Sequence, residues 1–169
     1  MHRFDPNRIF SDAGIRATLT RRGDNSEAAH QAVAAFATKL LRYLALDREP
    51  VILALHNTDG RGLTIQSYLS TNELSSASTQ VHVSAQRAAG DFFYVTDRRF
   101  FDYLKAQDFN VTLQDDARVT DDGSMSVYFA RRGIPYVNVE ADVKHLAEQV
   151  VMVRTAVQMM NDLNLIAPR

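Results

Sequence analysis

The alternation of hydrophobic and polar residues predicts helices and strands in turn along this chain. Residues 26–46 begin with Ser26, a residue type that caps helix N-termini, and then place apolar side chains at helical spacing. Residues 51–56, with the sequence VILALH, form a continuous apolar run of strand length, which is typical of a strand covered on both faces. The same reasoning predicts further strands at 91–97, 109–114 and 134–141, and further helices at 97–107, 122–133 and 143–163.

Two other segments have a distinct pattern. Residues 71–86 are rich in Ser, Thr, Asn and Gln and lack a clear period, so we expect an irregular surface loop there. The last predicted helix carries one apolar stripe, as an amphipathic helix does. This stripe consists of Leu146, Val150, Val153 and Val157.

Strands that alternate with helices predict an α/β fold, here in a single domain that spans residues 1–169. Because each parallel connection needs a right-handed crossover, we expect a mainly parallel or mixed sheet flanked by helices on both faces. In such sheets, ligands gather where strands end and loops begin. The polar residues at the predicted strand ends are His56, Asp97, Gln114 and Glu140.

The amino-acid composition argues against several classes of function. The chain has 19 basic and 20 acidic residues and a net charge of -1, without the basic excess that binding to a phosphate backbone requires, so nucleic acid is not an expected partner. The absence of cysteine excludes disulfides, thiol nucleophiles and thiolate metal sites, so a metal would need His, Asp or Glu ligands. No apolar stretch approaches the roughly 20 residues that cross a bilayer. We therefore expect a cytoplasmic protein with no membrane partner.

His56 and Glu140 are the strongest candidates for chemistry. Each follows an apolar strand, and each also has a plainer interpretation, His56 as a structural hydrogen-bonding group and Glu140 as a solvated strand end. If the two strands are neighbours, the side chains would converge on one site. A neutral imidazole could then bind a metal, and the carboxylate could take a proton from metal-bound water.

The order of these short motifs resembles that of the zinc carboxypeptidase-like metallohydrolases. FDPNRIF is similar to the family segment whose Asn and Arg hold a substrate carboxylate, which implies substrate-binding roles for Asn7 and Arg8. Without this resemblance, the same segment would be interpreted as a surface turn. ALHN resembles the segment with the family's third zinc ligand, at His56, and YVNVEA resembles the strand with its catalytic glutamate, at Glu140. The resemblance spans residues 5–141 and implies the family's fold.

One family motif is missing. The family's first two zinc ligands come from an H-x-x-E motif before the Asn-Arg segment, whereas the H-x-x-E of this chain is His145 to Glu148, after Glu140 and within a predicted helix. Three explanations remain open. The chain is the carboxyl-terminal part of a longer hydrolase that lacks the first strands here, a second polypeptide or copy completes the site, or the protein is a non-catalytic relative that binds a carboxylate-bearing peptide.

The leading hypothesis is a zinc-dependent carboxypeptidase or amidohydrolase whose zinc ligands are incomplete in this chain and which is inactive alone. The alternative is a non-catalytic binding or interaction protein on the same scaffold. A small peptide or an N-acyl amino acid is the expected ligand. An exposed sheet edge, left where early strands are missing, favours a homo-oligomer.

Overall fold

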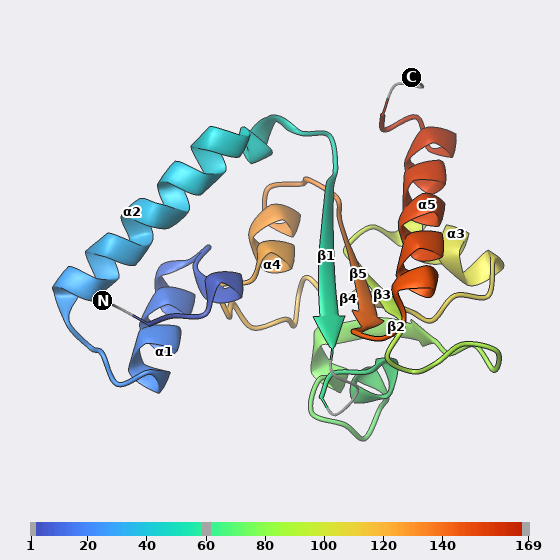
Figure 1. Cartoon of the computed structure of the whole chain (residues 1–169), viewed down its shortest axis with the longest axis horizontal. Helices are drawn as coiled ribbons and strands as arrows, with labels where there is room; N and C mark the ends of the chain where they lie inside the picture. The colour runs from blue at the N-terminus through green and yellow to red at the C-terminus, as the bar shows by residue number, and fades with distance from the viewer. Residues whose placement is uncertain (1–2, 59–61, 167–169) are drawn as a thin grey trace. The chain divides into compact units, whose positions relative to one another are not determined.

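The computed structural model describes residues 3–58 and 62–166 (Figure 1). The chain, predicted as one domain, divides into two compact units. Unit 1 comprises Met1–Glu49 and Thr120–Ile134, and unit 2 comprises Pro50–Val119 and Pro135–Arg169. Each unit is described by itself.

Unit 1 is helical. Its elements are η1 (Pro6–Arg8), α1 (Asp12–Arg21), α2 (Glu27–Leu44), η2 (Leu46–Arg48) and α4 (Met125–Ala130). As predicted, Ser26 caps α2, since its side chain accepts a hydrogen bond from the backbone N–H of Ala29. The sequence pattern did not predict α1, which Ser11 caps in the same way through Gly14.

The core of unit 1 forms between α1, α2 and the segment that leads into α1. Its fully buried members include small residues of α2 that allow close helix packing. The buried set is Ile9, Phe10, Ile15, Leu19, Ala29, Val33 and Ala37. Two apolar residues of α2, Phe36 and Leu44, are 46% and 48% exposed.

Unit 2 is built on a five-stranded mixed sheet in the order β1-β5-β3-β4-β2. The strands are β1 (Ile52–Thr58), β2 (Ser78–His82), β3 (Phe92–Val95), β4 (Val111–Gln114) and β5 (Tyr136–Asp142). The pairs β1–β5 and β3–β4 are parallel, whereas β3–β5 and β2–β4 are antiparallel. The chain is therefore α/β with a mixed sheet. The predicted loop at 71–86 contains β2, a short polar edge strand that the periodicity did not reveal.

The two α-helices of unit 2 cover the same face of this sheet. They are α3 (Arg98–Ala106) and α5 (Leu146–Asp162), and they pack against alternate residues of β3, β4 and β5. The prediction of helices on both faces is wrong within unit 2. Its opposite face carries the short segment η3 (Ile65–Tyr68), which packs on Phe92, and a row of polar side chains. A further 3-10 segment, η4 (Ser75–Ala77), precedes β2.

Helix α5 has two apolar stripes, and the predicted one is not the stripe that packs on the sheet. The sheet-facing stripe consists of Met152, Ala156, Met159 and Met160, each no more than 3% exposed. The predicted stripe, called the lateral stripe below, is more open. Its members are Leu146, Val150 and Val157, which are 69%, 41% and 39% exposed, and the partly buried Val153. No helix in the described ranges is long and apolar enough to span a membrane.

Candidate functional site

His56 and Glu140 lie side by side in unit 2. They are Cα partners in the parallel pairing of β1 with β5, and partners in register project from the same face of a sheet. His56 Nδ1 lies 3.6 Å from Glu140 Oε2, and the two side chains are 35% and 6% exposed. The register of two neighbouring strands thus brings an imidazole and a carboxylate together. Neither residue ends its strand, because β1 continues to Thr58 and β5 continues to Asp142.

Burial controls the acidity of Glu140. Loss of hydration raises its pKa above the ordinary value, while a hydrogen bond from Asn138 Nδ2, 3.0 Å from Glu140 Oε2, and the charge of His56 act in the opposite direction. The carboxyl group therefore retains its proton to higher pH than a solvated glutamate. Such a group can exchange a proton with a bound molecule closer to neutral pH.

Asn138 lies two residues before Glu140 on the same face of β5 and is 7% exposed. Its Nδ2 donates to Glu140, but its buried Oδ1 has no hydrogen-bond partner within the described part of the chain. A buried acceptor without a donor costs free energy unless a water molecule or a ligand supplies that donor. Asn138 Oδ1 is therefore an unused acceptor beside the buried carboxyl group of Glu140.

A second set of polar side chains on this face is satisfied internally. Tyr94 is the Cα partner of Asn138 across β3 and β5, and its hydroxyl donates to Gln114 Oε1 at 2.9 Å. Gln114 Nε2 in turn donates to Asp116 Oδ1 at 2.6 Å. These contacts give the hydroxyl and amide groups partners within the protein, in contrast to Asn138 Oδ1.

The four polar residues predicted at strand ends do not lie at one edge of the sheet. Because β3 and β4 run antiparallel to β5, the carboxyl ends that carry Asp97 and Gln114 point away from those of β1 and β5. Asp97 caps α3 by accepting a hydrogen bond from the backbone N–H of Arg99 and also forms an ion pair with that arginine. Its role is therefore structural.

Asn7 and Arg8, the predicted substrate-binding residues, lie in η1 of unit 1. Asp5 caps this turn by accepting a hydrogen bond from the backbone N–H of Asn7. Arg8 Nε lies 3.0 Å from Asp122 Oδ2, and both side chains are partly exposed. Arg8 thus already binds a carboxylate of its own chain, and its contact with a substrate stays a prediction.

The residues that the structure describes do not fit a zinc ion. A zinc site normally needs three or four protein ligands, and the described ranges contain no group of three or more His, Asp or Glu side chains placed to hold a metal. His145 and Glu148 have separate partners, since His145 Nδ1 lies 2.7 Å from Asp91 Oδ2 and Glu148 forms an ion pair with Arg87. His56 and Glu140 alone are two ligands at most.

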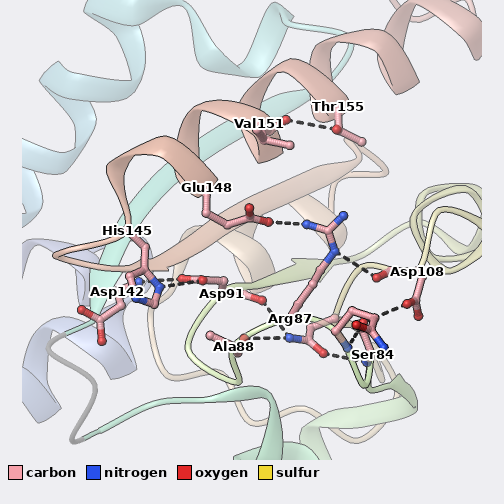
Figure 2. A network of polar contacts seen from close by, with 12 residues as sticks. Ser84, Arg87, Ala88, Asp91, Asp108, Asp142, His145, Glu148, Val151 and Thr155 are labelled. Carbon is pink, nitrogen blue, oxygen red and sulfur yellow. Dashed lines mark hydrogen bonds and ion pairs between the residues drawn. The ribbon is translucent and has the colours of Figure 1, made fainter.

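A second polar cluster joins the N-terminus of α5 to the loop before β3 (Figure 2). The buried Asp91 accepts hydrogen bonds from the His145 ring and from the backbone N–H of Asp142. Arg87 stacks on the ring of Phe109, with 3.5 Å between its guanidinium carbon and the ring centroid. The hydrogen bond and charge of Asp91 raise the pKa of His145. A pocket of about 370 Å³ opens beside Arg87 and Asp91.

This cluster fixes the loop at 84–91 rather than presenting free groups. Asn110, which is fully buried, accepts a hydrogen bond from the backbone N–H of Ser84 and donates to the carbonyls of Ala88 and Asp91. Both carboxylate oxygens of Asp91 are occupied. Sequence reasoning did not single out Asp91 or Asn110, because each stands at a strand start and gives no periodic signal.

Comparisons with protein-family models, with curated proteins and with solved structures gave no match.

Proposed function

We propose that unit 2 is a ligand-binding module that recognises an N–H group of a small peptide or N-acyl amino acid on the sheet face that carries His56, Asn138 and Glu140. The observation that supports this proposal is the buried Asn138 Oδ1, which lacks a donor in the described residues, beside the buried carboxyl group of Glu140. An amide or amino group of the ligand would donate to both oxygens. His56, the most exposed of the three, would form the entrance to the site.

The cost of keeping Glu140 buried also supports a binding role. A carboxyl group with a raised pKa destabilises the folded state at neutral pH, where a glutamine of the same shape would not. Groups that reduce stability are frequent at functional sites, because binding or catalysis needs chemistry that folding does not.

An NMR titration tests this proposal. We expect N-acetylglycinamide, which carries amide N–H groups, to shift the backbone signals of His56, Asn138 and Glu140, and sodium acetate, which has no donor, to leave them in place. Asn138→Ala and Glu140→Gln should abolish the shifts. Tyr94→Phe is the matched control, because its hydroxyl is bonded to another side chain. Shifts that map elsewhere, or that survive both substitutions, would refute the proposal.

A hydrolase of the carboxypeptidase type is the second candidate, and the 3.6 Å approach of His56 to Glu140 favours it. Ionised Glu140 would accept a proton from a water molecule that attacks the amide carbonyl, and its protonated form would return that proton to the leaving nitrogen. The measurement is hydrolysis of N-acetyl amino acids and dipeptides with and without added zinc. A rate above that of buffer that disappears in Glu140→Gln would favour this candidate, whereas binding without turnover would favour the first.

A further inference from the structure

The two edges of the sheet in unit 2 are protected to different degrees. β2 forms one edge, and it is short and has a register shift between Ser78 and Gln80. Short strands and bulges discourage pairing with another chain. β1 forms the other edge and has seven residues, all in register with β5, and no Asp, Glu, Lys or Arg. No further strand pairs with β1 among the described residues. The β1 edge therefore lacks the usual protection.

The hydrogen-bonding groups on the open edge of β1 follow from the pairing on its other side. The Ile52 N–H donates to the carbonyl of Pro135, the residue before β5. The Thr58 carbonyl accepts from the backbone N–H of Val143, the residue after β5. Backbone groups alternate in direction along a strand, so even-numbered residues point towards β5. The N–H and C=O groups of Leu53, Leu55 and Asn57 therefore point outwards.

The lateral stripe of α5 lies next to the side of the helix that contacts β1. Gln149 Nε2 donates to the His56 carbonyl at 3.2 Å, so that side of α5 contacts β1. Successive residues of a helix are rotated by about 100°, so the side chains of the lateral stripe all lie within about 100° of Gln149 around the helix axis. These residues are Leu146, Val150, Val153 and Val157. Glu148 lies on the other side, where it binds Arg87 (Figure 2). Leu55, on the same sheet face as α5 and 53% exposed, extends the apolar surface onto β1.

We propose that the open edge of β1 and the lateral stripe of α5 form the interface of a two-fold symmetric homodimer. Antiparallel pairing of β1 with its copy, centred on Leu55, would place Leu53 opposite Asn57 of the second copy and Leu55 opposite its own equivalent. All outward N–H and C=O groups of Leu53, Leu55 and Asn57 would then be bonded. The result is a continuous sheet of ten strands, five from each copy.

A second copy suits this surface in charge and in size. The residues of the edge and of the stripe include no Lys, Arg, Asp or Glu, so these residues would not oppose like charges in two copies, and the exposed Arg154 borders the stripe one turn after Val150. Seven strand residues and 17 helix residues give a face about 25 Å long, and the strand and helix layers make it roughly 20 Å high. Such a face is of the same order as the roughly 800 Å² that each partner buries in a standard interface.

The proposed dimer interface and the proposed ligand site lie mainly on different faces of the sheet. His56 and Glu140 project from the sheet face opposite α5, whereas the lateral stripe lies on the α5 face. The two proposed sites adjoin only at β1, where His56 would stand opposite Ala54 of the second copy. The dimer would carry two such sites on one face of its continuous sheet. Loss of dimerisation and loss of ligand binding are therefore separately measurable.

Sedimentation equilibrium of the full chain, from roughly 1 µM to 1 mM, tests this interface. We expect a species of twice 19.0 kDa for the wild type. Leu55→Lys and Val150→Lys would each place an unpaired charge in the interface and raise the dissociation constant roughly a hundredfold or more. Val151→Lys is the matched control, because Val151 is 44% exposed but lies about 100° around α5 from Val150. It should leave the dimer intact.

Two other readouts make the result decisive. Circular dichroism shows whether each variant is folded, and the affected side chains are exposed enough to accept lysine. In the wild type, amide hydrogen exchange at Leu53, Leu55 and Asn57 should slow as protein concentration rises, while that at Ser78 to His82 should not. A monomer throughout the concentration range would overturn the proposal. A dimer that tolerates both Leu55→Lys and Val150→Lys would also overturn it.

Discussion

Asn110 is the residue whose removal should most weaken the loop before β3. Its side chain is fully buried and makes three hydrogen bonds to backbone groups of Ser84, Ala88 and Asp91, at 2.8, 2.9 and 3.0 Å. Asn110→Ala removes all three bonds at once. The consequences differ for each partner, because some have other bonds and some do not.

The magnitude follows from these partners. The Ser84 N–H is a buried donor that would lose its acceptor, at a cost of about 1–3 kcal/mol. The Ala88 carbonyl also accepts from the backbone N–H of Asp91, so its loss is smaller, about 1 kcal/mol, and the Asp91 carbonyl adds a similar amount. We expect Asn110→Ala to lower the free energy of unfolding by about 3–5 kcal/mol in total.

Urea unfolding followed by circular dichroism measures this change, and amide exchange at Ser84 reports the loop directly. Gln158→Ala is the matched control. Gln158 is an exposed amide on α5 that bonds to Asp162 one turn away, so its removal should change stability by no more than about 0.5 kcal/mol. A loss below about 1 kcal/mol for Asn110→Ala, with unchanged exchange at Ser84, would refute the reasoning.

Three further substitutions have distinct expected outcomes. Gly14→Ala should destabilise unit 1 by more than about 2 kcal/mol in thermal unfolding, because a Cβ at this position would lie within 3 Å of backbone atoms. Gly62→Ala is the control and should be nearly neutral, because there is open space around Gly62. Asp91→Asn should destabilise the fold more at pH 5.5 than at pH 9. The raised pKa of His145 stabilises the folded state below the pKa of the unfolded chain, near 6.5, and this stabilisation is lost as the pH rises through the pKa of the folded state. Equal losses of stability at both pH values would exclude the His145–Asp91 pair as the cause. Glu140→Gln should be more stable than wild type at pH 7 and equal to it below about pH 4, since a glutamate with a raised pKa loses folded-state stability as pH rises. A glutamine variant less stable than wild type at pH 7 would contradict that expectation.

The sequence predicted the elements with strong local patterns. The helix capped by Ser26 and the strands around His56 and Glu140 are all present. Local signals sufficed there because a capping side chain or a continuous apolar run acts within a few residues. The edge strand Ser78–His82 was predicted as a loop because polar residues dominate it, and its hydrogen bonds come from β4, which lies 29 to 36 residues further along the chain.

The candidate site was predictable only in part. The sequence indicated His56 and Glu140 as polar residues in apolar strands, and the register of β1 with β5 places them 3.6 Å apart. Asn138 was missed, because an asparagine within a strand has no distinctive spacing. Its unpartnered oxygen is visible only once the neighbouring strands are known.

By itself, the sequence determined most of the segments that become strands and helices, with α1 and β2 as the exceptions, since hydrophobic period and end capping act locally. Only the tertiary structure decided the direction of β3 and β4 relative to β5, because a buried strand has the same apolar composition whether its neighbours are parallel or antiparallel. The same holds for α5, whose two apolar stripes are both compatible with burial. Packing against the sheet selected the stripe with Met152 and Met159, and left Leu146 and Val150 exposed beside an open strand edge.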